Sequence, residues 1–365
     1  MIPELRTLLD MLTYCRPMGS LTESAFIDRW IRPLGAIQDL SRNWHMTVPR
    51  ADGSPSRVLW SCHTDTVARQ DGRQTVHYEH ATGMVGLSRR SRAAFRNCLG
   101  ADDTAGVWLC VQMIQANVPG HYVFHYGEER GGIGSSALAY GEPHRLDGLD
   151  CAIALDRRGT DDVITHQYGM RCASDAFADS LALEIFRASD ERLIYGPAHG
   201  IYTDTAEYVS LVRECTNLSV GYQDEHTADE TLDVDHAIRL LNALRLFDET
   251  ALVIEKDVEP VWDNWNSYSE PSIEWTTIRK DGTTIFLPRD VDASPNVDDD
   301  GFVLNDDDDD DDDETLAVDC YLDRVHRDVQ RALLRHDCPR CGRDTFVGFD
   351  HRCNFEPLRF SRMVD

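Results

Sequence analysis

Five short polar segments, each beside an apolar run, constrain the fold of this chain more than any other feature. Four follow strand-like stretches: His63-Thr64-Asp65 after VLWSC, Glu128-Glu129 after HYVFHYG, Asp156 at the end of CAIALD, and His226 shortly after TNLSVGY. The fifth, Asp102-Asp103, lies in GADDTAG, directly before a helical pattern. Because ligands of an open α/β sheet bind at the carboxyl ends of its strands, we expect these side chains to converge there.

Strand-like and helix-like patterns alternate up to about residue 256, which is typical of a doubly wound, largely parallel sheet flanked by helices. Near the N-terminus, Ser20 and Glu23 have the spacing of a capping box, so a helix is expected to begin there. A long helix closes this region, and its apolar side is formed by Ile238, Leu241, Leu244 and Phe247. We therefore expect one α/β domain over residues 1–256.

The chain changes in character after residue 256. Residues 257–297 hold short apolar patches, which predict a small β appendage or an extension packed on the main domain. Residues 298–316 contain an unbroken acidic run that repels itself, so we predict a disordered linker, with calcium or a basic partner as the alternative reading. Residues 317–365 begin with a short helical pattern and end in a cysteine-rich tail.

The tail contains a candidate structural zinc site. Its donors would be Cys338, Cys341, His351 and Cys353. Cys-x-x-Cys resembles half of a zinc ribbon, but a single residue between the last two donors is tighter than the usual spacing. Cys320 or His336 could complete the site instead, and a chance cluster is the remaining alternative.

Composition excludes several classes of partner. The formal net charge of -28 argues against nucleic acid or an anionic membrane, because phosphate binding needs a basic surface. We find no N-terminal signal segment and no apolar run long enough to span a bilayer. Eleven scattered cysteines form no disulfide framework. We therefore predict a cytoplasmic protein that binds neither nucleic acid nor membrane, and its oligomeric state stays open.

Carboxylates and neutral imidazoles that meet at strand ends are typical ligands of a divalent metal such as zinc. The adjacent pair Glu128-Glu129 suits a hydrolytic site, because one carboxylate can bind a metal while its neighbour acts as a base. Asp65, two residues after His63, can accept the second imidazole N–H and fix the tautomer. The residues alone therefore predict metal-assisted hydrolysis.

The motifs HTDT, GADDTAG, YGEERGGIGSSALA, ALDRRG and GYQDEHTADETL resemble, in order and spacing, those of the co-catalytic di-zinc exopeptidases. This clan includes bacterial tripeptidase, acetylornithine-type deacylases and lidless aminopeptidases. The resemblance covers roughly residues 55–250. It implies that the first domain is catalytic and has the zinc-exopeptidase fold.

The resemblance also implies a ligand set. By position, Asp102 would bridge two divalent ions, which are expected to be zinc, with cobalt or manganese as alternatives. His63 and Asp156 would complete one site. Glu129 and His226 would complete the other.

Two further roles follow from the same resemblance. Glu128 would be the general base that activates a hydroxide bridging the ions, and Asp65 would orient His63. The segment AHGIYTDTAEYVSL resembles a substrate-side loop, so His199 or Tyr202 could stabilise the oxyanion. The alternative is that Tyr202 and Tyr208 only pack under the sheet.

Members of the clan that have a lid carry an inserted domain, on the order of 100 residues. Only 70 positions separate Asp156 from His226, so we expect no lid. We therefore predict an aminopeptidase acting on short peptides. An N-acyl amino acid deacylase is the alternative, with Arg157, Arg158 and Arg171 as sources of a cationic pocket. From another class, an inactive binding or scaffold protein is the further alternative.

Overall fold

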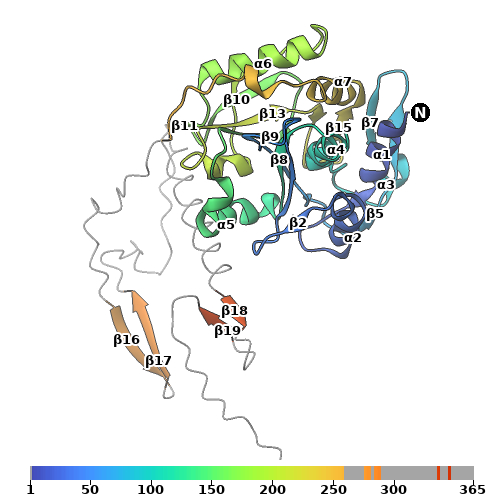
Figure 1. The fold of residues 1–365 in the computed structure, drawn as a ribbon. Coiled ribbons are helices and arrows are strands. Elements are labelled where there is room, and N and C mark those ends of the chain that lie inside the picture. The colour runs from blue at the N-terminus through green and yellow to red at the C-terminus, as the bar shows by residue number, and fades with distance from the viewer. Residues whose placement is uncertain (1, 259–274, 281–282, 289–334, 338–343, 347–365) are drawn as a thin grey trace, which may run out of the picture. The chain divides into compact units, whose positions relative to one another are not determined.

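The computed structural model describes residues 2–258 and four short strands beyond them. Residues 2–258 form an α/β fold around a nine-stranded mixed sheet (Figure 1). In spatial order its strands are β11 (Met170–Arg171), β10 (Asp162–Gln167), β13 (Glu214–Ser219), β9 (Cys151–Arg157), β4 (Val58–His63), β8 (Gly120–His125), β3 (Trp44–Val48) and β2 (Ile37–Gln38), and β12 (Gly196–His199) also pairs with β10.

The centre of this sheet is parallel and its edges are mostly antiparallel. Strands β13, β9, β4 and β8 are parallel neighbours. By contrast, β2, β3, β10 and β11 pair antiparallel with their neighbours, and only β12 adds a parallel pair at the edge. The prediction of a largely parallel sheet is therefore confirmed for the centre, which is the part that positions the polar segments.

Helices cover both faces of the sheet. The α-helices of residues 2–258 are α1 (Pro3–Met11), α2 (Leu21–Trp30), α3 (Arg89–Ala93), α4 (Ala101–Gln115), α5 (Ile133–Gly141), α6 (Asp175–Ala188) and α7 (Val234–Leu244), of which α2 and α3 pack against strands of the smaller sheets. Figure 1 shows α6 and α7 on one side of the sheet and α5 on the other. Strand β4 contributes to both cores, since Val58 and Trp60 pack into the larger core and Leu59 into the smaller one. A strand buried on both faces reads as the continuous apolar run seen in the sequence.

The helix predicted at Ser20 is present. Of the two hydrogen bonds of the expected capping box, the one accepted by Ser20 is formed and the one accepted by Glu23 is replaced. Ser20 Oγ accepts the backbone N–H of Glu23 at 3.0 Å, as expected. The Glu23 carboxylate instead accepts from Gly19 N and from the hydroxyl of Thr64. Glu23 is therefore buried beneath the loop that follows β4, where its carboxylate connects the start of its own helix to a residue far along the chain.

Smaller sheets complete residues 2–258. Strands β14 (Tyr222–Gln223), β15 (Thr231–Asp233), β7 (Met84–Leu87) and β6 (Val76–Glu79) form one of them, and β1 (Tyr14–Cys15) pairs with β5 (Gly72–Arg73). His226 lies in the loop between β14 and β15. Between Asp156 and this loop the chain forms β10–β13 and α6, so these described residues belong to the main sheet and its covering helix.

Beyond residue 258, β16 (Trp275–Lys280) pairs with β17 (Thr283–Pro288), and β18 (Arg335–Asp337) pairs with β19 (Asp344–Phe346). The predicted linker over 298–316 and the candidate zinc donors Cys338, Cys341, His351 and Cys353 lie outside the described residues. These expectations stay predictions. In the described part of the chain, no helix combines the length and apolar character needed to cross a membrane.

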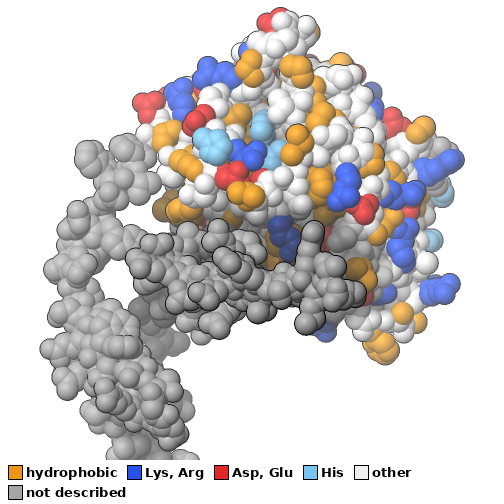
Figure 2. Space-filling view, turned by 60° about the horizontal axis from the view of Figure 1, so that its bottom comes forward, with side chains coloured by type: hydrophobic (Ala, Val, Ile, Leu, Met, Phe, Trp, Pro, Cys, Tyr) orange, Lys and Arg blue, Asp and Glu red, His pale blue; other side chains and the backbone are white. Residues whose placement is uncertain are grey.

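The surface of the main domain mixes side-chain types. Figure 2 shows acidic, basic and apolar side chains interspersed over the face that it presents. Intermixed charges of both signs are typical of a solvated surface.

Candidate metal centre

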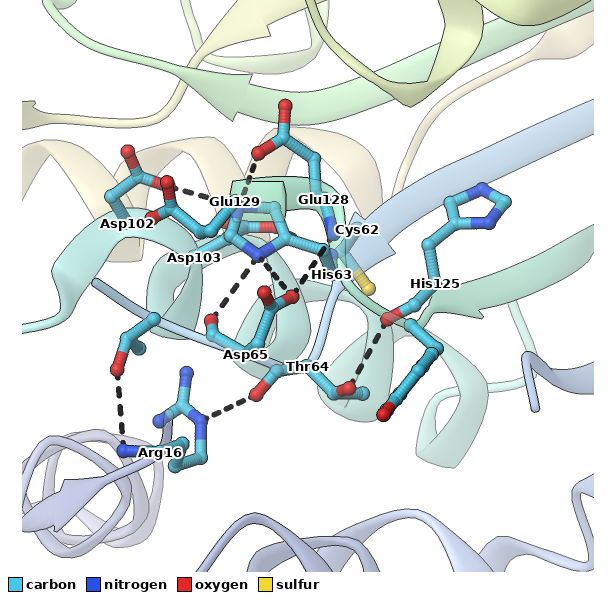
Figure 3. Close-up of polar contacts among 12 residues, drawn as sticks. Arg16, Cys62, His63, Thr64, Asp65, Asp102, Asp103, His125, Glu128 and Glu129 are labelled. Atoms are coloured by element: carbon cyan, nitrogen blue, oxygen red, sulfur yellow. Dashed lines mark hydrogen bonds and ion pairs between the residues drawn. The ribbon is translucent and has the colours of Figure 1, made fainter. Parts of the chain in front are cut away.

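The five polar segments meet at the carboxyl ends of the parallel strands. Figure 3 shows His63, Asp102, Glu128 and Glu129 of this group close together. His63 ends β4, Asp156 lies near the end of β9, and Glu128 follows β8 after a two-residue turn. The loop with His226 follows β13, and Asp102 lies at the start of α4, which packs against β4 and β9. The convergence expected from the strand-end rule is therefore present.

Asp102 lies between the two histidines. Its Oδ1 is 3.0 Å from Nε2 of His63, and its Oδ2 is 3.2 Å from Nε2 of His226. On the His63 side, Asp156 Oδ1 lies 3.4 Å from the same Nε2 atom. On the His226 side, Glu129 Oε2 lies 3.1 Å from that imidazole nitrogen. The five residues thus form two three-ligand groups that share one carboxylate.

These separations fit metal coordination. Donor atoms bound at about 2.0–2.1 Å to one tetrahedral zinc ion lie about 3.3 Å apart. The four nitrogen–oxygen distances, from 3.0 to 3.4 Å, are close to that spacing. Three donors on each side would leave a fourth position for water or substrate, as a catalytic site needs.

Asp103 is a competing donor near His63, since its carboxylate lies within 4.8 Å of the donor atoms of His63 and Asp156. Both of its oxygens, however, accept backbone N–H groups, from His63 at 3.1 Å and from Gly106 at 2.8 Å. Asp103 therefore fixes the backbone of the site. Asp102 remains the carboxylate that faces both histidines.

The buried charge of the cluster also fits divalent cations. Burial raises the pKa of Glu128 and Asp156, and burial with the charge of Asp102 raises the pKa of Glu129 to about 7. Glu129 Oε1 has no hydrogen-bond partner among the described residues. Buried carboxylates in such excess need metal ions or protons to neutralise them.

The pKa values of the two histidines also indicate that the cluster favours positive charge. Burial alone would lower the pKa of His63, but the carboxylates of Asp156 and Asp102 outweigh it and raise that pKa well above its usual value. Hydrogen bonds to Asp102 and Glu129 raise the pKa of His226 to about 11. Metal binding requires neutral imidazoles, so a bound ion would displace these protons and supply the positive charge instead.

The two adjacent glutamates differ in position. Glu129 contacts His226, whereas the nearest imidazole to Glu128 is that of His63, at 4.0 Å. The Glu128 side chain is about one-eighth exposed, at 13%. Its carboxylate is therefore near the donors but outside both three-ligand groups, which leaves it available for proton transfer.

Asp65 connects His63 to Glu128. The nearest acceptor to His63 Nδ1 is the main-chain oxygen of Asp65, at 3.2 Å, and the carboxylate oxygen Oδ1 is 3.5 Å away. The same Oδ1 accepts the backbone N–H of Glu128 at 3.2 Å. The carboxylate–imidazole contact expected from the HTD motif is therefore supplemented by a main-chain acceptor, and Asp65 also holds the loop of the candidate base.

Several supporting residues could not be singled out from the sequence. Asp156 receives hydrogen bonds from the hydroxyl of Thr203 at 2.7 Å and from that of Tyr222 at 3.2 Å. Glu230, fully buried, accepts the backbone N–H groups of residues 100–102 at 2.7 to 3.1 Å. Such partners hold ligating carboxylates in place. They lie within the quoted motifs, but only the folded chain shows what they touch.

The two candidate oxyanion residues have different positions. His199 is exposed and packs against His166, with ring centroids 4.3 Å apart. Because β10 runs antiparallel to β13, His199 lies toward the amino ends of the central strands, away from the metal centre. Tyr202 donates to Glu207 at 3.1 Å and lies beside the loop that follows Glu128, where a side chain at Gly132 would meet its hydroxyl. Of the two, only Tyr202 is close to the centre.

Every arginine proposed for a cationic pocket is paired with a carboxylate. Arg157 contacts Asp162 at 2.9 Å, Arg158 contacts Glu225 at 3.1 Å, and Arg171 contacts Asp175 at 2.9 Å. These pairs weaken the case for a site that binds a substrate carboxylate.

The perturbed groups predict how the metal-free protein responds to pH. Burial raises the pKa of Glu129 to about 7 and that of Glu230 to about 8, whereas glutamate in an unfolded chain titrates near 4.3. The folded state therefore holds these protons more tightly. The raised pKa of His226, about 11, acts in the same direction above its unfolded value. The free energy of unfolding should fall as pH rises from about 5 to about 8.

Urea denaturation of chelator-treated protein across this pH range measures the effect. Excess zinc should flatten or reverse the trend, because the ligands must lose protons to bind metal. A metal-free protein whose stability rises over the same range would contradict these assignments.

The chain matches no protein-family model and no curated protein sequence. Its fold, however, is similar to solved structures. The aminopeptidase PepT of Bacillus cereus superposes with a TM-score of 0.55 at 13% identity, over 68% of this chain and 98% of that one. A tripeptidase from Staphylococcus aureus gives a TM-score of 0.53 at 14% identity, over 68% and 98%. These similarities confirm the expected fold, an α/β fold that the chain shares with these two peptidases.

Proposed function

We propose that the chain is a zinc-dependent hydrolase that cleaves amide bonds, acting as an aminopeptidase on short peptides. The observation that supports this most is Asp102, whose two oxygens face separate groups of ligands, His63 with Asp156 and His226 with Glu129. Such a shared carboxylate is the expected bridge of a two-ion hydrolytic site. Cobalt or manganese could occupy the same donors.

The side chains have distinct tasks in this reaction. Bound zinc ions would polarise the scissile carbonyl and lower the pKa of a water molecule. Glu128 takes the proton from the attacking water and delivers it to the leaving amine, since its carboxylate is near the ligands without belonging to them. Its raised pKa, caused mainly by burial, suits a group that must both accept and donate a proton.

The cations near the site favour an aminopeptidase over a deacylase. A deacylase of N-acyl amino acids needs a cationic group to bind the substrate carboxylate. The arginines that could bind a substrate carboxylate are already paired. Residues 157–225 also add strands to the main sheet, which supports a site without a lid.

An inactive scaffold protein is the alternative of another class. Loss of activity in a hydrolase fold is expected to remove a ligand or the base. Here all five donors and Glu128 are present and converge. The complete set favours an enzyme.

A substrate pair tests the proposal. Zinc-loaded protein should hydrolyse free-amine dipeptides and leave the matching N-acetylated compounds intact, because the acetyl group removes the ammonium charge. Amine release measured by ninhydrin or chromatography gives both rates, and Glu128→Gln protein prepared in the same way controls for contaminating peptidases. Preference for the acylated compound would identify a deacylase. A protein that binds no zinc and hydrolyses neither compound would be the scaffold.

A further inference from the structure

Arg16 is a fully buried cation that none of the motifs contains. It follows the short strand β1, and its guanidinium carbon lies 4.1 Å from the centre of the Phe26 ring. Burying a charge is costly unless hydrogen bonds and nearby opposite charges compensate it. The contacts of the guanidinium group should therefore show why a charged side chain is buried at this position.

The guanidinium connects two loops of the metal centre. Its Nε donates to the main-chain oxygen of Thr64 at 2.7 Å (Figure 3). Its Nη1 donates to the hydroxyl of Thr104 at 2.9 Å. Thr64 directly follows His63, and Thr104 lies two residues after Asp102 on α4. One side chain thus contacts both the loop with the first histidine and the helix start with the shared carboxylate.

The main chain strengthens this connection. Arg16 N donates to the hydroxyl of Thr66 at 3.2 Å, and Thr66 N donates to the oxygen of Arg16 at 2.8 Å. The hydroxyl of Thr104 in turn donates to the oxygen of Gly100 at the beginning of α4. The contact network therefore runs without a gap from the loop after β4 to the first turn of the helix.

We propose that Arg16 is a positioning residue of the metal centre, whose guanidinium clamps the His63 loop to the start of α4 and so sets the separation of His63 and Asp102. This inference rests on the zinc binding proposed above. An arginine suits the task because its planar group donates in two fixed directions at once, whereas a lysine ammonium is a point charge that cannot replace both contacts.

Two effects of removing Arg16 have opposite signs. Loss of the clamp lets the two ligand loops move apart and weakens zinc binding. Loss of the positive charge removes a repulsion on the metal ions and strengthens zinc binding. The direction of the change therefore distinguishes positioning from simple electrostatics.

The test measures zinc affinity of the full chain by competition with a chromophoric chelator. Arg16→Met and Arg16→Lys should both weaken zinc binding, by about 10- to 100-fold, the usual cost of losing a residue that holds a metal ligand. The visible spectrum of cobalt-loaded protein should also change, which a purely structural role elsewhere in the fold would not cause. Circular dichroism of the metal-free proteins confirms that each variant is folded.

A milder variant covers the case in which Arg16 variants fail to fold. Thr104→Val removes the hydroxyl that accepts from Arg16 and donates to Gly100 O, so it breaks the network at the helix start and should also weaken zinc binding. Thr165→Val is the matched control, since this buried hydroxyl donates to Ala198 O on an edge strand, and zinc binding should stay unchanged.

Each remaining outcome is decisive. Wild-type affinity in Thr104→Val and in the folded Arg16 variants would overturn the clamp, as would tighter zinc binding. Normal binding by Arg16→Lys beside weak binding by Arg16→Met would mean that a single donor at this position is enough, and would overturn the two-sided clamp. If the wild-type protein itself binds no zinc, the proposed function fails, which is a separate result.

Discussion

Replacing Glu128 with glutamine should lower kcat by about 10²- to 10⁴-fold, the usual contribution of a general acid–base group, while two zinc ions stay bound. The carboxylate lies outside both ligand groups, 4.0 Å from His63 Nε2, so its loss removes a proton acceptor without removing a donor to metal. Glutamine keeps the shape of the side chain and cannot take up the proton. Metal content by plasma emission spectrometry and steady-state kinetics on the same sample measure both effects.

Glu129→Gln is the matched comparison, because the two residues are adjacent and both carboxylates are largely buried. This variant should lose zinc on the His226 side, since Glu129 Oε2 lies 3.1 Å from that imidazole. If Glu128→Gln lost zinc and Glu129→Gln kept it, the two roles would have to be exchanged. If Glu128→Gln kept near-wild-type turnover, Glu128 would not be the base.

The convergence of the site could be predicted from the sequence because it depends on local signals. Apolar runs end in polar residues at β4, β8 and β9, and a helical pattern begins just after Asp102. Parallel strands bring their carboxyl ends to one edge, so the meeting of these residues follows from the sheet itself. No knowledge of tertiary contacts is needed for this step.

The supporting contacts could not be predicted in this way. Arg16 meets Thr104 across 88 positions of sequence, and Glu230 meets Ala101 across 129. A single arginine or glutamate has no periodic pattern that indicates its partner. The capping box was only half correct for the same reason. The carboxylate of Glu23 accepts a hydrogen bond from Thr64, a distant residue that no local pattern indicates.

The antiparallel pairing at the edges of the sheet could not be predicted from the sequence pattern either. Alternating strands and helices predict parallel pairing, but β10 turns back beside β13 and places His199 away from the centre. The segment that contains both candidate oxyanion residues therefore begins toward the amino ends of the central strands and ends beside the metal centre. Tyr202, three residues later, returns to the site because the following segment places Thr203 against Asp156.

Asp102→Asn should abolish detectable activity and weaken zinc binding on both sides of the centre. The two carboxylate oxygens face His63 and His226 separately, and an asparagine offers a single oxygen acceptor and no charge. At most one of the two metal sites keeps an oxygen ligand at this position, so the two zinc ions cannot both stay bound. No other single substitution among the proposed ligands affects both groups directly.

Thermal unfolding with and without zinc gives a second measurement of the same effect. A ligand at about 100 times its Kd stabilises the folded protein by about 2.7 kcal/mol, so zinc should raise the Tm of the wild type and have little effect on Asp102→Asn. Asp39→Asn is the matched control, because Asp39 is also a buried carboxylate paired with a histidine, His45, at 2.8 Å, and it lies outside the metal centre. That variant should bind zinc normally even if its metal-free Tm falls. Two tightly bound zinc ions in Asp102→Asn would show that Asp102 does not bridge the ions, and would point to the neighbouring carboxylate of Asp103 as the donor on the His63 side.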